Sequence, residues 1–177
     1  MAQQQSTWDH TLPGAETTTH VYARIGERKL HCHLHLPAGR GSGEPTCPES
    51  PSEKMPVIVW VHGSGFFGGK HLLGTPPAFT CPSFIAAGYA ILQVEHRSSR
   101  EPGGQFPAGL HDIKAAIRWL RHKVTTDVAL NLDPDRIGIW GASSGGWYSA
   151  MVAVLSSKTV RTQSLYIEIE ATRVSGG

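Results

Sequence analysis

The sequence is poor in cysteine, in charged residues and in long apolar stretches. Its three cysteines, Cys32, Cys47 and Cys81, are odd in number and have no paired spacing, so we expect free thiols and not a disulfide framework. Charged residues make up 17% of the chain, and the basic ones are scattered, with a net charge of +2. Such a distribution does not form the clustered basic patch that is typical of nucleic-acid-binding proteins.

No stretch reaches the ~18 consecutive apolar residues that a membrane span requires. The N-terminal residues, Met-Ala-Gln-Gln-Gln, contain no basic region followed by an apolar run, so no signal peptide is predicted. Apolar residues make up 40% of the chain, which is ordinary for a globular protein. We therefore expect a soluble, cytoplasmic protein with no membrane or nucleic-acid partner. The sequence leaves the oligomeric state open.

Strand-like and helix-like patterns alternate through the centre of the chain. Residues 1–19 are polar and are predicted to be a loose lead-in, and residues 20–177 are predicted to form one domain. Strands are expected at 21–25, 30–36, 57–61, 90–94, 137–140 and 167–170, helices at 83–87, 110–124 and 147–155, and long loops at 37–56 and 63–82. This alternation predicts an α/β fold, with a mostly parallel sheet and helices on both faces.

The motif Gly141-Ala142-Ser143-Ser144-Gly145-Gly146 follows one predicted strand and precedes a predicted helix. G-x-S-x-G in this context is typical of a nucleophilic serine on a sharp turn. Glycines two positions before and after Ser143 avoid side-chain collisions across such a turn. The alternative is a glycine-rich strand-to-helix turn without catalytic meaning, because the motif is short.

A second glycine-rich stretch, His62-Gly63-Ser64-Gly65-Phe66-Phe67-Gly68-Gly69, follows the apolar run 57–61 directly. Its backbone N–H groups, with the N–H of the residue after the serine, can bind an anionic oxygen. Ligand sites in parallel sheets lie beyond the carboxyl ends of the strands, where both motifs fall. Phe66 and Phe67 are predicted either to line an acyl pocket or to pack beneath the loop.

Together these motifs resemble the α/β-hydrolase superfamily, in particular small esterases of the hormone-sensitive-lipase and feruloyl-esterase-like (BD-FAE-like) groups. The matching segments are 56–69, 93–98, 106–120 and 133–146, within a resemblance over about 21–155. The resemblance implies that Ser143 is the nucleophile, that His62 orients the loop, and that the oxyanion hole is formed around Gly63, Ser64, Gly65 and Ser144. It implies a small-molecule ester substrate, without a cofactor or metal. Ser64 and Ala142 depart from the usual family residues, but neither removes a backbone donor.

The acid and the base of the triad are missing from their usual place. In this fold the order is serine, then Asp or Glu, then His, yet the 34 residues after Ser143 contain no Asp and no His. Glu168 and Glu170 follow, but a carboxylate without an imidazole is a poor base for a serine. The resemblance therefore implies a C-terminally truncated α/β-hydrolase that lacks the last strands. Two functions stay open: a serine carboxylester hydrolase, weakly active or inactive in this form, or an incompetent hydrolase-like fragment that at most binds.

Three histidines, His31, His33 and His35, alternate along one predicted strand and so share one face. Imidazole is a common metal ligand, but no further ligand has the spacing of a zinc site. We therefore expect no metal and predict that these histidines form the polar, solvent-exposed face of an antiparallel strand. His96 and His122 are expected to be surface or structural residues.

Overall fold

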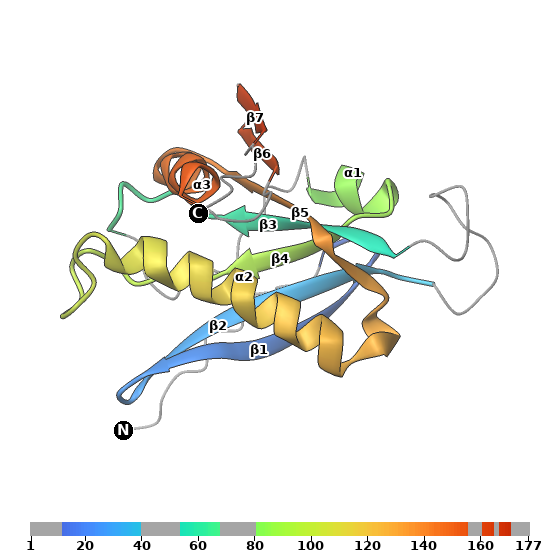
Figure 1. Ribbon diagram of the computed structural model, residues 1–177, viewed down its shortest axis with the longest axis horizontal. Coiled ribbons are helices and arrows are strands. Elements are labelled where there is room, and N and C mark those ends of the chain that lie inside the picture. The colour runs from blue at the N-terminus through green and yellow to red at the C-terminus, as the bar shows by residue number, and fades with distance from the viewer. Residues whose placement is uncertain (1–11, 40–53, 68–80, 156–160, 165–166, 171–177) are drawn as a thin grey trace, which may run out of the picture.

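The computed structural model describes residues 12–39, 54–67, 81–155, 161–164 and 167–170. Its strands form one seven-stranded sheet in the order β1-β2-β4-β3-β5-β6-β7 (Figure 1). The strands are β1 (Ala15–Ile25), β2 (Arg28–Pro37), β3 (Met55–Val61), β4 (Ala90–Val94), β5 (Leu132–Gly141), β6 (Arg161–Ser164) and β7 (Ile167–Glu170).

The centre of the sheet is parallel and its two ends are antiparallel. β3 lies between β4 and β5 and runs parallel to both. β1 and β2 form an antiparallel hairpin, and β2 pairs antiparallel with β4. The hairpin turn passes through Gly26 at φ 57°, a conformation that glycine adopts without the steric cost of a Cβ. The predicted α/β architecture is confirmed.

Within the described residues, three α-helices cover the sheet: α1 (Cys81–Ala86), α2 (Ala108–Thr126) and α3 (Ser144–Val154). A 3₁₀ turn, η2 (Val128–Leu130), follows α2. The apolar positions of α2 recur every three or four residues, and this stripe is buried, as an amphipathic helix on a sheet requires. The buried stripe consists of Leu110, Ile113, Ile117, Leu120 and Val124.

Alternate residues of β3 enter two separate apolar cores. Val57, Val59 and Val61 pack into the core shared with α2 and α3. Ile58 and Trp60 pack into a smaller core on the other face with α1. Side chains on a strand alternate between faces, so a strand covered on both sides is apolar throughout. Helices therefore cover both faces, as predicted.

Several predicted boundaries move. β1 begins at Ala15, so residues 15–19 form a strand, and the prediction of a loose lead-in is wrong for them. These residues pair with β2, but their polar, threonine-rich sequence does not show the apolar alternation of a strand. β5 begins at Leu132, before the predicted strand at 137–140, and its pairing with β3 shifts register between Met55 and Val57. Residues 1–11, 40–53 and 68–80, which include most of both predicted loops, lie outside the described residues.

The chain after α3 contributes two short strands instead of the single strand predicted. β6 pairs parallel with β5 at Gly138 and Ile139, and β7 pairs antiparallel with β6. This part of the chain therefore covers a portion of the outer edge of β5, which would otherwise expose unpaired backbone groups.

Cys32 and Cys81 are buried free thiols, as expected, and Cys47 lies outside the described residues. Within the part of the chain that the structure describes, no helix is long and apolar enough to cross a membrane.

Candidate active site

Ser143 sits at the sharp turn between β5 and α3. Its backbone has φ 53° and ψ −124°, and its side chain is exposed. A positive φ is uncommon for a residue with a Cβ and costs conformational energy. The fold therefore holds this serine in a strained conformation at the carboxyl end of a central strand, facing solvent.

The glycines around Ser143 allow two segments of backbone to touch. A Cβ on Gly145 would lie 2.2 Å from the carbonyl oxygen of Val61, and one on Gly141 would lie 2.5 Å from the carbonyl carbon of Gly145. Real Cβ atoms do not approach other atoms so closely, so any side chain here would push the turn away from β3. The G-x-S-x-G spacing is thus a steric requirement of this turn.

The loop after β3 lies directly against the turn that carries Ser143. Val61 and Gly141 are paired in register, so both strands end at the same level and their loops meet. A Cβ on Gly63 would lie 2.3 Å from the carbonyl oxygen of Ala142 and 2.9 Å from the Cβ of Ser143. The two motifs therefore form one site, with the backbone of the loop beside the serine.

One hydrogen bond joins the loop to the first residue of α3. The backbone N–H of Ser64 donates to Oγ of Ser144 at 2.9 Å. Beyond it the loop turns sharply, with Gly65 at φ 61° and Phe66 at φ 67°, and Phe67 N–H donates to the Ser64 carbonyl. Ser144 opens α3, so its own N–H is among the first-turn donors that have no partner within the helix. Donors of this kind favour an anion.

His62 lies beneath this loop in an aromatic stack. Its ring is parallel to that of His96, with centroids 4.4 Å apart, and His96 in turn packs against Tyr148 of α3. His96 is fully buried, and its Nδ1 lies 3.1 Å from the carbonyl oxygen of Arg97. Burial lowers the pKa of His96, because the charged ring is poorly solvated there. His96 is therefore a structural residue. His62 contacts it by ring stacking.

Aromatic side chains surround the opening of the site. Phe66 packs edge-on against Trp147 and Tyr148, whereas Phe67 is 56% exposed beneath the guanidinium of Arg100. Phe106 packs against the outer side of Trp147. Phe66 therefore follows the packing alternative, and Phe67 stays available to a ligand.

The loop after β4 supports the loop after β3. Both the N–H and the hydroxyl of Ser99 donate to the carbonyl oxygen of Phe66, at 2.9 and 3.0 Å. The neighbouring Ser98 N–H donates to Glu101, which also forms an ion pair with Arg28 of the β1–β2 hairpin. A chain of polar contacts thus links the hairpin to the strained turn at Phe66.

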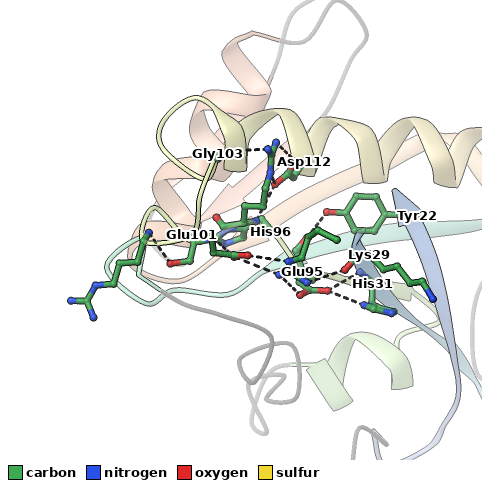
Figure 2. Close-up of polar contacts among 12 residues, drawn as sticks. Tyr22, Lys29, His31, Glu95, His96, Glu101, Gly103 and Asp112 are labelled. Carbon is green, nitrogen blue, oxygen red and sulfur yellow. Dashed lines mark hydrogen bonds and ion pairs between the residues drawn. The ribbon is translucent and has the colours of Figure 1, made fainter. Parts of the chain in front are cut away.

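Two buried carboxylates anchor this support, as Figure 2 shows. Glu95 accepts hydrogen bonds from the backbone and ring of His31 and pairs with Arg28 at 2.8 Å. Asp112 of α2 accepts three hydrogen bonds from Arg97, from its N–H, Nε and Nη2. Neither carboxylate was predicted from the sequence as an anchor, and Asp112 lies in the sequence of α2 near the polar residue Lys114. The helical spacing gave no sign that Arg97 would cover it.

The prediction of a solvent-exposed histidine face on β2 is wrong. His33 and His35 are buried, and their Nδ1 atoms are hydrogen-bonded to Thr19 and Thr17 across the hairpin. The threonines of β1 supply partners on the face that periodicity marked as polar. In the described residues no group of three or more His, Cys, Asp or Glu side chains is arranged to hold a metal ion.

The structure brings together every residue predicted for the site: Ser143, Ser144, His62, Gly63, Ser64 and Gly65 all lie where β3 and β5 end. Gly68 and Gly69, also placed in the loop, lie outside the described residues. The stacked imidazoles of His62 and His96 lie next to this loop. In the sequence, neither Asp nor His follows Ser143.

Comparison with known proteins gives the same picture. The chain is 29% identical over 136 residues to para-nitrobenzyl esterase of Bacillus subtilis, covering 71% of this chain and 27% of that protein. It is 33% identical over 104 residues to the carboxylesterase NlhH of Mycobacterium tuberculosis, covering 59% and 30%. The chain thus spans less than a third of the length of these relatives.

Among solved structures, a thermophilic esterase of Thermogutta terrifontis superposes with a TM-score of 0.58 at 26% identity, over 80% of this chain and 44% of that one. The sequence model of the BD-FAE family matches residues 46–174. The chain is an esterase- and lipase-like α/β-hydrolase and belongs to the BD-FAE family.

Proposed function

We propose that this chain carries the nucleophile and the oxyanion hole of a serine carboxylester hydrolase. Ser143 is the nucleophile that attacks the carbonyl carbon of a small ester. Backbone N–H groups around Gly63, Ser64, Gly65 and Ser144 stabilise the oxyanion that forms. This chemistry requires neither a metal nor a cofactor.

The conformation of Ser143 is the observation that carries the proposal. A non-glycine residue at φ 53° costs about 1–3 kcal/mol and persists only where the surrounding structure enforces it. A strand-to-helix turn with only a structural role has no need of that cost. Here the strained serine is exposed, and it lies beside a loop so close that a Cβ on Gly63 would come within 2.9 Å of the Ser143 Cβ.

The attack forms a bond between Oγ of Ser143 and the ester carbon, and the hydroxyl proton must pass to a base. The sequence after Ser143 offers no histidine for that role, and His62 is stacked on His96 under the loop. We therefore expect turnover by these 177 residues far below that of a complete esterase. A serine site without its triad partners still retains roughly 10³–10⁴-fold catalysis over water.

The second candidate is a hydrolase-like domain that binds a small ester or a partner and does not turn it over. The missing acid and base favour it. The two candidates share the fold and the oxyanion hole, and they differ in whether Ser143 completes a catalytic cycle.

Hydrolysis of p-nitrophenyl acetate by the purified chain separates them. We expect turnover barely above the buffer rate, lowered further in Ser143→Ala and unchanged in Ser83→Ala, a matched loss of an exposed hydroxyl on α1. Fast hydrolysis that Ser143→Ala abolishes would exclude the non-catalytic candidate. A residual rate that is identical in wild type and Ser143→Ala would mean that this turnover does not pass through Ser143, which favours the non-catalytic candidate.

A further inference from the structure

The hydrogen bond between the Ser64 N–H and Oγ of Ser144 occupies a donor that the oxyanion hole would use. We propose that the hydroxyl of Ser144 competes with the substrate oxyanion for this N–H, so that Ser144 weakens the oxyanion hole. This inference rests on the proposed function of the site, because it concerns how that site binds a developing negative charge.

A backbone N–H carries a single proton. At 2.9 Å the bond from Ser64 N–H to Ser144 Oγ has ordinary length and uses that proton fully. Ser144 is buried at 5% exposure, so its hydroxyl sits in a fixed place and water does not readily replace it. An oxyanion that needs the Ser64 N–H must first displace this internal acceptor.

The position of the loop does not depend on that hydrogen bond. The backbone of Gly63 packs on the carbonyl oxygen of Ala142, and Gly145 packs on the carbonyl groups of Val61 and His62, at distances that leave no room for a Cβ. On its far side the loop is held at the Phe66 carbonyl by Ser99. Removal of the Ser144 hydroxyl therefore leaves the Ser64 N–H in place, with its proton available to another acceptor.

Ser144→Ala should have two opposite effects, a loss of stability without a ligand and tighter binding of an anionic ligand, and this combination tests the inference. Without a ligand, a poorly solvated N–H loses its acceptor, so the protein becomes less stable. With an anionic ligand on Ser143, the same N–H gains a charged acceptor, and hydrogen bonds to charged groups are the stronger ones. A purely structural role for the hydroxyl predicts weaker ligand binding in the variant, and competition predicts tighter binding.

Phenylboronic acid is the probe, because it tests the oxyanion hole without a catalytic cycle. The Ser143 oxygen forms a bond to boron and its proton passes to water; the product is a tetrahedral boronate anion whose hydroxyl oxygens carry part of the negative charge. Affinity is measured by isothermal titration calorimetry for wild type, Ser144→Ala and Ser144→Thr, which keeps the hydroxyl. We expect Ser144→Ala to bind on the order of tenfold more tightly and Ser144→Thr to return toward the wild-type affinity.

Two controls make the outcome specific. Ser149→Ala removes another α3 hydroxyl, one that donates to the Gly145 carbonyl at 2.8 Å, and so loosens the helix without releasing the Ser64 N–H; its affinity should not rise. Ser143→Ala should abolish binding.

Each result decides between the proposals. Binding to wild type that requires Ser143, with equal or weaker binding to Ser144→Ala, would overturn the competition and leave the proposed function intact. Absence of binding to both wild type and Ser144→Ala, or binding that survives Ser143→Ala, would overturn both. Equal gains in Ser144→Ala and Ser149→Ala would also overturn the competition.

Discussion

The buried ion pair between Asp112 and Arg97 offers a sharp test of how the site is supported. The carboxylate is 4% exposed and the guanidinium 16% exposed, and they are 2.8 Å apart. Asp112 accepts three hydrogen bonds from Arg97, which lies in the loop after β4, beyond Glu95 and His96. We expect Asp112→Ala to be among the most damaging single changes to this chain.

The magnitude follows from what the substitution leaves behind. Truncation of one partner of a buried ion pair costs about 3–5 kcal/mol, because the other charge loses its counter-charge; the lower end applies here, since Arg97 keeps its hydrogen bond to the Gly103 carbonyl. Asp112→Asn keeps one acceptor and loses the charge, so it should cost about 1.5–3 kcal/mol. For a chain of this size each kcal/mol lowers the Tm by roughly 2–4 °C, which places the Tm of Asp112→Ala about 10 °C below that of the wild type.

Urea denaturation followed by tryptophan fluorescence measures these differences. The matched control is Lys123→Ala, which breaks the more exposed pair with Asp127, 3.0 Å apart on the last turn of α2; it should cost below about 1 kcal/mol. The double variant Arg97→Met, Asp112→Leu should recover most of the loss, since no charge is then left unpaired. A cost for Asp112→Ala no larger than that of Lys123→Ala would refute the reasoning.

Three further predictions concern packing, pH and thiol access. Gly145→Ala forces a Cβ against the Val61 carbonyl and should cost about 1–3 kcal/mol, measured by the same urea titration; an unchanged midpoint would contradict the close contact. The pKa of His96 in the folded protein lies below its ordinary value, so the unfolded state binds a proton more readily than the folded state. The free energy of unfolding is therefore unaffected by His96 above about pH 6.5 and falls as the pH drops below that value. His96→Phe should make the Tm less dependent on pH between pH 7.5 and 5, and parallel Tm curves for the two proteins would contradict this. Burial raises the pKa of Cys81 to about 12 and also raises that of Cys32. In a Cys47→Ser variant, a disulfide reagent at pH 8 should therefore label these two thiols only after the protein unfolds. Rapid labelling of the native protein would disprove their burial.

Local sequence patterns predicted the centre of the fold well. The apolar run at 57–61 and the stripe from Leu110 to Val124 matched β3 and the buried face of α2. Each signal reports the burial of its own element, so no knowledge of neighbours was needed. The G-x-S-x-G spacing was equally local, because the glycines are required by the turn itself.

The errors arose where burial depends on a partner far away in the sequence. Asp112 looks like part of a polar helix face until Arg97 covers it. His33 and His35 look solvent-exposed until Thr19 and Thr17 of the neighbouring strand supply hydrogen bonds. A polar side chain is buried only when such a partner exists, and the periodicity of one segment carries no information about that partner.

The topology of the sheet brings the residues of the proposed oxyanion hole together without any segment after α3. β3 and β5 are adjacent and end in register at Val61 and Gly141, so the loop after β3 and the turn at Ser143 meet with no help from later segments. The strained serine, the loop donors and the supporting contacts of Ser99 all come from residues 61–145. His62 and His96 also fall within this range, but their rings are stacked on each other, and neither is proposed as the base. Under the proposed function, binding of an anionic tetrahedral ligand at Ser143 is therefore a separate property from turnover of an ester, and the boronate titration addresses the first without requiring the second.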